Sequence, residues 1–190
     1  CPSDIIQSND PGLCSAVVNY SVPTGTDNCF VDSTWISLGD SSGASFPVGP
    51  PITVEYFVQD AAGLQGSCSF TITVVDTTGP SLTCPSDTTL ANDSLSCDAV
   101  FSYSIPFADN CSASSLSQLN GLPSGSAFPL GSTINEFSVV DASLNSSTCS
   151  FTVTVIDTIA PVTNCFPDTI LFNDSGSCGA IFNYTLPSAN

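Results

Sequence analysis

The chain has 190 residues and contains no lysine, arginine or histidine against 17 acidic residues, which gives a formal net charge of −17. A surface without cations does not neutralise phosphates, so binding to nucleic acid or anionic lipid is disfavoured throughout the chain. Histidine, the commonest catalytic base, and the cationic groups that activate nucleophiles are missing, so we expect no catalytic residue and no enzyme activity.

All 10 cysteines fall in one frame with a period of about 81 residues, which indicates tandem copies of one folded unit. The period predicts repeat 1 over residues 1–79, repeat 2 over 80–160 and the N-terminal part of repeat 3 over 161–190. No pair has zinc-finger or redox Cys-x-x-Cys spacing, so we expect disulfide bonds and an extracellular protein. Corresponding positions are Cys1, Cys84 and Cys165; Cys14, Cys97 and Cys178; Cys29 and Cys111; and Cys68 and Cys149.

Within repeat 1, alternating apolar and polar residues predict β-strands, in chain order, over residues 18–22, 52–60 and 70–74. Pro23 ends the first strand, and Trp35, the single tryptophan, is expected in the core. No stretch has a helical period. Short strands separated by turn residues predict a small antiparallel β-sandwich. The corresponding strands cover residues 101–105, 133–141 and 151–155 in repeat 2, and 182–186 in repeat 3.

The connection between repeats is short and contains proline. It has the sequence Asp-Thr-Thr-Gly-Pro at residues 76–80 and returns as Asp-Thr-Ile-Ala-Pro at 157–161. A linker of this composition is not a flexible tether, so we expect consecutive repeats to form a semi-rigid rod.

Short motifs recur in the same order in both full repeats. Repeat 1 contains Cys1-Pro2, Asp27-Asn28-Cys29, Phe46-Pro47 with Gly49, Asp60-Ala61, and Cys68-Ser69-Phe70 leading to Asp76. Repeat 2 contains Cys84-Pro85, Asp109-Asn110-Cys111, Phe128-Pro129 with Gly131, Asp141-Ala142 with Asn145, and Cys149-Ser150-Phe151 leading to Asp157. In this order and spacing the chain resembles the hyalin repeat (HYR) family over essentially its whole length. The resemblance implies tandem immunoglobulin-like antiparallel β-sandwiches, stapled by disulfides, in extracellular adhesion and matrix proteins without catalytic activity.

The resemblance also implies a disulfide pattern. Family members with only two cysteines match the first and fourth positions of each repeat. This implies Cys1–Cys68 and Cys84–Cys149, and leaves Cys14–Cys29 and Cys97–Cys111 as the other pairs, with Cys165 and Cys178 bonded to cysteines beyond residue 190. Four cysteines nevertheless allow three connectivities. The main alternative pairs the first position with the second and would join Cys165 to Cys178.

Oxygen ligands for a divalent cation are abundant in this chain, and calcium takes six to eight of them from carboxylates, carbonyls and water. If the linker lies on top of repeat 2, Asp76 approaches the Asp109-Asn110 loop and Asp141. This predicts a calcium site formed by Asp76, Asp109, Asn110 and Asp141. The alternative is that Asp109 and Asn110 only cap a turn through side-chain hydrogen bonds and that Asp76 only starts the linker.

Covalent glycans are a second expected modification. Asn-x-Ser/Thr triplets make six asparagines candidate acceptors in a glycosylating organism: Asn19, Asn92, Asn110, Asn145, Asn173 and Asn183.

These features predict an extracellular structural and adhesive protein whose tandem domains form a stalk, fibril or matrix filament. The expected partners are other copies of the chain and matrix or cell-surface components. No run of 18 apolar residues is present, so we expect no membrane insertion. The alternative is a spacer or ligand-binding module of a secreted or cell-surface enzyme or receptor. Because repeat 3 stops before its third cysteine, we expect the chain to be part of a longer array.

Overall fold

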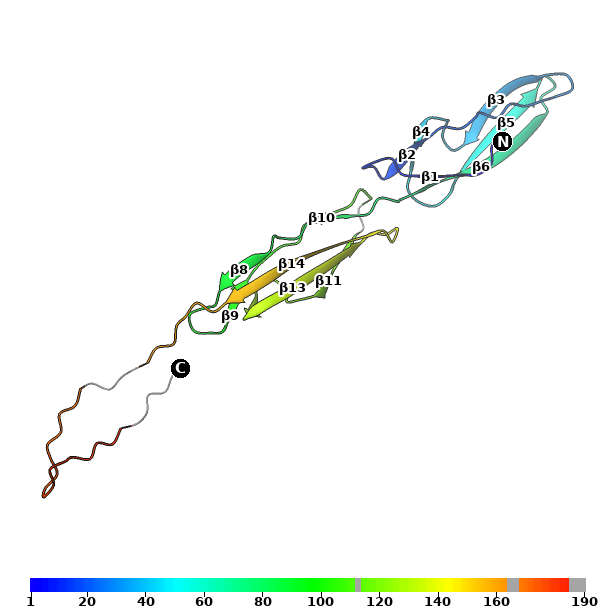
Figure 1. The fold of residues 1–190 in the computed structure, drawn as a ribbon. Helices are drawn as coiled ribbons and strands as arrows, with labels where there is room; N and C mark the ends of the chain where they lie inside the picture. Colours follow the sequence, from blue (N-terminus) through cyan, green and yellow to red (C-terminus); the bar gives the residue numbers. More distant parts are fainter. Residues whose placement is uncertain (112–113, 164–167, 185–190) are drawn as a thin grey trace.

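A computed structural model describes residues 1–111, 114–163 and 168–184 (Figure 1). Repeats 1 and 2 lie end to end and form an elongated molecule. No helix long and apolar enough to cross a membrane occurs among the described residues. The strands of repeat 1 are β1 (Ile5–Ser8), β2 (Ser15–Val18), β3 (Val31–Leu38), β4 (Ala44–Pro47), β5 (Ile52–Asp60) and β6 (Gln65–Val75). Those of repeat 2 are β7 (Ser81–Leu82), β8 (Thr88–Ala91), β9 (Asp98–Phe101), β10 (Phe107–Ala108), β11 (Ser115–Asn120), β12 (Ser126–Pro129), β13 (Gly131–Val140) and β14 (Ser146–Ile156).

Repeats 1 and 2 are each a β-sandwich, which confirms the predicted fold class. In repeat 1 a four-stranded sheet in the order β1-β6-β5-β3 is faced by the pair β2-β4. Repeat 2 has the same arrangement, β8-β14-β13-β11 faced by β9-β12, with a further short pair, β7-β10. The pairs are antiparallel except for the edge strands β1 and β8, which run parallel to β6 and β14.

The parallel edge strand explains the first disulfide of each repeat. The backbone N–H of Thr71 in β6 donates to the Asp4 carboxylate at 2.7 Å, just before β1 pairs with the same strand. This contact holds the start of the chain beside β6 and brings the Cα atoms of Cys1 and Cys68 to 5.7 Å. The contact between Thr152 and Asp87 (2.7 Å) does the same in repeat 2. Disulfides Cys1–Cys68 and Cys84–Cys149 are therefore confirmed.

The core of repeat 1 lies between its two sheets. Phe46 of β4 is completely buried, and it packs in one cluster with Val54 of β5 and Phe70 of β6. Phe128 takes the place of Phe46 in repeat 2. The alternation of apolar residues in β5 and β6 therefore marks the inner face, as the sequence predicts.

The predicted strand at residues 18–22 is misplaced, because only Val18 of that range lies in a strand. β2 ends at Val18, and the next backbone N–H toward the sheet, that of Tyr20, donates to the Ser42 hydroxyl (2.8 Å) instead of a strand carbonyl. Tyr20 still packs edge-on against Phe70, and its hydroxyl donates to the Asp40 carbonyl at 2.6 Å. Burial, with the hydroxyl contact to Tyr56, raises the pKa of Tyr20, so this phenol stays neutral.

Repeat 2 departs from its prediction in the same way. β9 ends at Phe101, and the Tyr103 N–H donates to the Ser124 hydroxyl at 2.7 Å, so the predicted strand 101–105 is not formed beyond its first residue. In repeat 3, residues 182–184 form no strand, and residues 185 and 186 lie outside the described residues.

Trp35 does not fill the core, and that prediction is wrong. The side chain is 37% exposed and stacks on Phe57, with ring centroids 5.8 Å apart. The neighbouring residue in β3, Ile36, packs against the core instead. Successive side chains of a strand point to opposite faces, so Ile36 and Trp35 cannot both point inward.

Replacing Phe46 by alanine should destabilise repeat 1 strongly, because the fully buried ring leaves a cavity between the sheets. The free energy of unfolding should fall by about 3–5 kcal/mol. Urea unfolding followed by Trp35 fluorescence measures this change. Phe30→Ala is the matched control: Phe30 is 62% exposed, and its removal should cost under about 0.5 kcal/mol. Equal losses in the two variants would contradict the placement of the core.

Candidate functional site

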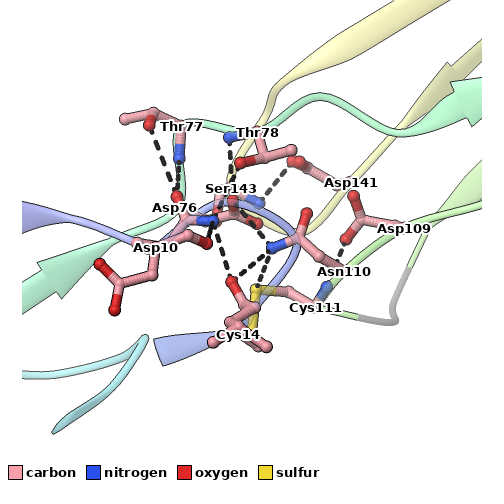
Figure 2. Close-up of a disulfide and its surroundings, with 12 residues drawn as sticks. Asp10, Cys14, Asp76, Thr77, Thr78, Asp109, Asn110, Cys111, Asp141 and Ser143 are labelled. Atoms are coloured by element: carbon pink, nitrogen blue, oxygen red, sulfur yellow. Dashed lines mark hydrogen bonds between the residues drawn. A yellow bond between two sulfur atoms is a disulfide. The ribbon is translucent and has the colours of Figure 1, made fainter. Parts of the chain in front are cut away.

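The contact between repeats 1 and 2 gathers most of the residues singled out by the sequence. We call this region the joint. It comprises the linker 76–80, the turn 9–14 at the end of repeat 1, and the loop 109–111 and the turn 141–145 at the facing end of repeat 2 (Figure 2).

Asn9 attaches the linker to repeat 1. Its side-chain oxygen accepts the Thr77 N–H (3.0 Å), and its amide nitrogen donates to the Thr78 hydroxyl (2.9 Å) and to the Leu13 carbonyl (3.0 Å). The residue is 8% exposed, and an amide buried at this depth is costly unless it is hydrogen-bonded. The linker therefore cannot leave the end of repeat 1 without exposing or orphaning these groups.

Asn145 attaches the same linker to repeat 2. Its amide nitrogen donates to the Asp76 carbonyl oxygen (3.1 Å) and to the Asp141 carboxylate (2.9 Å). Pro80, which follows, is fully buried. The linker is thus bound by one asparagine from each side, which agrees with the expected semi-rigid connection. The sequence marks Asn145 through its place in the Asp141-Ala142 motif, but only the fold reveals this contact.

A disulfide between Cys14 and Cys111 crosses the joint, with Cα atoms 4.8 Å apart. The predicted pairs Cys14–Cys29 and Cys97–Cys111 are wrong, and Cys29 and Cys97 are unbonded and exposed. Cys14 lies at the end of β6, because its carbonyl accepts the Val48 N–H and the neighbouring Gly49 N–H donates to the Val74 carbonyl. Cys29 comes just before β3, whose first residue pairs with Asp60 near the start of β6.

The length of β6 separates Cys14 from Cys29 in repeat 1. A strand of 11 residues covers roughly 35 Å, whereas disulfide-bonded residues need Cα atoms within about 7 Å. Pairing inside a repeat is therefore geometrically impossible for the second and third positions. Cys178 is unbonded and exposed, and Cys165 lies outside the described residues.

Next to this disulfide, Asn110 reaches from repeat 2 into repeat 1. Its amide nitrogen donates to the Leu13 carbonyl at 3.0 Å and lies 3.2 Å from the sulfur of Cys111. The following backbone N–H, that of Cys111, donates to Asp109 at 2.9 Å, which closes a tight side-chain turn. This turn aims both the asparagine and the cysteine at the end of repeat 1.

Three side-chain oxygens in the joint are buried and have no hydrogen-bond partner. They are Oδ2 of Asp76, Oδ1 of Asp109 and Oδ1 of Asn110. Asp76 is only 6% exposed, and its carboxylate, that of Asp109 and the sulfur of Cys111 offer atoms that all lie within 4.8 Å of one another. Sulfur in a disulfide is not a thiolate ligand, so the donor set is two carboxylates and one amide oxygen, which suits a hard cation such as calcium.

Asp141, the fourth predicted ligand, is engaged elsewhere. Its Oδ1 accepts the backbone N–H groups of Ser143 and Asn145, each at 2.8 Å, and its Oδ2 accepts the Asn145 amide. Asp141 therefore caps the turn 141–145 and does not join the other predicted ligands. The structure brings together Asp76, Asp109 and Asn110, and Asp141 supports them by orienting Asn145.

The candidate glycan acceptors fall into two groups. The amides of Asn110 and Asn145 are half-buried and donate hydrogen bonds across the joint, and half-buried Asn92 donates to the Ser96 carbonyl and accepts the Thr158 N–H. A glycan on these amides would displace such contacts. Exposed positions are Asn19, Asn173 and Asn183, where glycosylation stays a prediction.

Comparison with known proteins points to one family. The HYR domain profile matches residues 1–74 and 75–155. The chain is 32% identical over its whole length to Hyalin of Strongylocentrotus purpuratus, of which it covers 16%, and 30% identical over 97% of its length to Hyalin of Lytechinus variegatus, of which it covers 35%. It thus spans much less than half of either relative. Among solved structures, Drosophila N-cadherin EC1-3 aligns with 86% of this chain and 66% of its own, at 12% identity and a TM-score of 0.44.

Removing the disulfide of the joint should loosen it and destabilise the chain. In Cys14→Ser/Cys111→Ser only the linker still connects the repeats covalently, so small-angle X-ray scattering should show a less extended average shape. A bond that closes a loop of 97 residues should contribute about 2–4 kcal/mol to the free energy of unfolding. The matched control, Cys29→Ser/Cys97→Ser, removes two unbonded thiols and should change neither quantity. An unchanged double variant would contradict the bond.

Proposed function

The chain belongs to the HYR domain family, and from that premise we propose that it is an extracellular structural and adhesive protein whose tandem repeats form a rod within a stalk, fibril or matrix filament. One observation carries the proposal: adjacent repeats are joined at two separate covalent points, the linker and the Cys14–Cys111 disulfide. A single connection permits rotation in all directions, whereas two spaced connections leave at most one axis. The joint is therefore suited to transmit force along the chain.

The disulfides inside the repeats support a mechanical role. Cys1–Cys68 and Cys84–Cys149 each enclose nearly the whole of one repeat, so a pulling force bypasses the strands through the sulfur atoms. Between Cys1 and Cys149, the backbone that force can extend is then limited to the segment between Cys68 and Cys84. This segment contains the linker, which Asn9 and Asn145 hold in place through hydrogen bonds.

The charge of the chain supports an exposed extracellular position. A net charge of −17 without any cation keeps the surface hydrated and opposes unspecific side-by-side association. Proteases that cleave after lysine or arginine find no site in this sequence. Binding to other copies or to matrix components would gain strength from repetition, because linked copies of a weak site bind together with high avidity.

Electron microscopy of the secreted parent protein tests the structural role. Uniform fibres or extended rods are expected, with an axial repeat equal to the length of one sandwich plus its linker. Reduction with dithiothreitol should make these rods visibly more bent. Compact isolated particles in the oxidised sample would contradict the proposal.

Calcium is the second part of the proposal. The three unpartnered oxygens of Asp76, Asp109 and Asn110 support it, because buried polar atoms are seldom left unsatisfied. The carboxylates of Asp76 and Asp109 offer oxygens within 4.8 Å of each other, and like charges this close repel each other. The sequence supplies no lysine, arginine or histidine to relieve this repulsion, so a bound cation would do so.

Such an ion would act on the joint. Asp76 belongs to the linker, whereas Asp109 and Asn110 belong to repeat 2, and Asn110 contacts repeat 1 through the Leu13 carbonyl. A cation held by all three would fix the linker against the loop 109–111, next to the disulfide. Water and backbone carbonyls would complete its shell, since calcium takes six to eight oxygens.

Calcium should therefore stabilise the chain, and Asp109→Asn should abolish the effect. At a concentration about 100 times the dissociation constant, stabilisation of about 2.7 kcal/mol is expected, seen as a higher Tm than in a chelator. The matched control is Asp27→Asn, because the Asp27 carboxylate accepts the Cys29 N–H (2.8 Å) as Asp109 accepts that of Cys111, but is exposed at the other end of repeat 1. Asn keeps the accepting oxygen in both turns. The same Tm with calcium and with chelator in the native chain would overturn this proposal.

A further inference from the structure

Three cysteines among the described residues carry no bond and are exposed: Cys29, Cys97 and Cys178. Disulfide-rich extracellular proteins seldom leave exposed thiols, and an unpaired one suggests a partner outside the segment. The repeats of this chain allow that partner to be identified, because each unbonded cysteine has a bonded counterpart at the same position of another repeat.

Second-position cysteines sit in one and the same turn. In repeat 1 an asparagine amide, that of Asn9, donates to the Leu13 carbonyl at 3.0 Å, and the next residue of the chain is Cys14. The corresponding contact in repeat 2, from Asn92 to the Ser96 carbonyl, measures 3.1 Å and precedes Cys97. Repeat 3 has it as well, at 2.9 Å from Asn173 to Ser177, just before Cys178.

The backbone of this turn also recurs. The Asp10 N–H donates to the Ser15 carbonyl at 2.8 Å, the Asp93 N–H to the Asp98 carbonyl at 2.7 Å, and the Asp174 N–H to the Gly179 carbonyl at 2.8 Å. The three cysteines are thus held by equivalent hydrogen bonds on both sides. Cys97 therefore lies at the end of repeat 2 as Cys14 lies at the end of repeat 1, and Cys178 lies in the same kind of turn.

Third-position cysteines share a different turn. The Cys111 N–H donates to the Asp109 carboxylate at 2.9 Å, and the Cys29 N–H donates to the Asp27 carboxylate at 2.8 Å. Repeat 1 consequently presents Asp27, Asn28 and Cys29 at its free end in the local geometry with which repeat 2 presents its own triplet to the joint.

Exposure separates the bonded positions from the unbonded ones. Asp109, Asn110 and Cys111 are half-buried because repeat 1 contacts them, whereas Asp27, Asn28 and Cys29 are all exposed. The same contrast holds at the other end of a repeat: Cys14 is half-buried, and Cys97 is exposed. In the linkers, Asp76 is buried and its counterpart Asp157 is exposed. The surfaces exposed at the outer ends of repeats 1 and 2 therefore correspond to the surfaces that are buried at the joint.

We propose that Cys97 and Cys29 are the two halves of further disulfides of the Cys14–Cys111 kind, so that the second cysteine of every repeat is bonded to the third cysteine of the repeat that follows. Cys97 is then bonded to the third cysteine of the following repeat, and Cys29 is bonded to the second cysteine of the preceding repeat. The partner is another HYR repeat of the same array. The inference rests on the proposed function in one respect: it requires that further repeats adjoin repeats 1 and 2 in a tandem array.

Among the described residues, Cys29 and Cys97 lie too far apart to bond to each other. Cys14 and Cys111 are already bonded. Cys29 lies at the start of β6, at the end of repeat 1 that faces away from repeat 2. Cys97 follows β8, whose neighbour Asn92 donates its backbone N–H to Ile156 at the end of β14, so it lies at the far end of repeat 2. The length of the two repeats separates these thiols.

Formation of each bond is an ordinary two-electron oxidation. The thiols of Cys97 and of the partner cysteine lose two protons and two electrons and form one S–S bond. A low-molecular-weight disulfide, such as glutathione disulfide in the secretory pathway, accepts them by thiol–disulfide exchange and leaves as two thiols. In the array the two cysteines are held at the same joint, which favours this exchange over bonds between separate chains.

The joint that precedes repeat 1 would depend on its disulfide more than the joint seen here. Asn145, which binds the linker from repeat 2, corresponds to Leu64 in repeat 1. The backbone N–H of Leu64 donates to Asp60 as that of Asn145 donates to Asp141, but Leu64 is 72% exposed. A leucine side chain donates no hydrogen bond to a preceding linker. The covalent bond at Cys29 would then be the main fixed point of that joint.

A tandem protein tests the proposal with this chain's own residues. Residues 1–164 of one copy are followed directly by residues 1–190 of a second, so that Cys1 of the second copy takes the place of Cys165. In the test variant, Cys29→Ser in the first copy and Cys97→Ser, Cys165→Ser and Cys178→Ser in the second leave Cys97 of the first copy facing Cys29 of the second. After folding with reduced and oxidised glutathione, thiols per monomeric chain should number zero, and peptic peptides should contain a Cys97–Cys29 link.

The control variant has the same composition. It carries Cys97→Ser in the first copy and Cys29→Ser, Cys165→Ser and Cys178→Ser in the second, so that its two remaining thiols lie at opposite ends of the rod and both should react with iodoacetamide. Two reactive thiols in the test variant, or a Cys14–Cys29 peptide, would overturn the proposal. Because thiols are counted in monomeric chains, this result does not depend on whether the parent protein forms filaments, which microscopy tests separately.

Discussion

The Cys14–Cys111 disulfide is the constraint on which the relation between the repeats depends. Each sandwich forms its own core, and the linker alone would leave them free to pivot. The disulfide adds a second fixed point beside the linker, and Asn9 and Asn145 bind the linker from opposite sides. The relative position of the repeats is therefore set by covalent geometry and by the hydrogen bonds of Asn9, Asn110 and Asn145.

Electrostatics gives the same joint its second property. Folding brings the carboxylates of Asp76 and Asp109 together in a protein without any cationic side chain, and leaves one oxygen of each, with one of Asn110, unpartnered. Hydrogen bonds to backbone N–H groups satisfy the other oxygens of the two aspartates. In each carboxylate, one oxygen thus accepts a hydrogen bond within a turn, and the other oxygen is available for a cation. Turn capping and cation binding, stated from the sequence as alternatives, are compatible here.

Repetition lets one repeat serve as a reference for another. The hairpin that carries the second cysteine keeps the same hydrogen bonds in all three repeats, including repeat 3, whose described residues form no strand. Local side-chain contacts therefore fix the position of this cysteine before any partner is present. Where a neighbouring repeat covers the position, the cysteine is bonded and half-buried; where none does, it is exposed.

The sequence by itself determined the period and the sandwich, because repeated motifs and alternating apolar residues are local signals of a repeated unit and of a buried face. The disulfides Cys1–Cys68 and Cys84–Cys149 followed from the resemblance to the HYR family, since the residues alone left three connectivities open. The sequence also indicated that Asp76 and Asp109 approach each other, since both flank the boundary between repeats. Only the tertiary structure decided the partner of Cys14, the outward position of Trp35 and the role of Asn145. Where two adjacent residues of a strand are both apolar, as Trp35 and Ile36 are, the sequence does not tell which of them faces the core. Spacing along the chain likewise does not show that a strand of roughly 35 Å separates Cys14 from Cys29, whereas Cys111 of the next repeat lies within bonding distance.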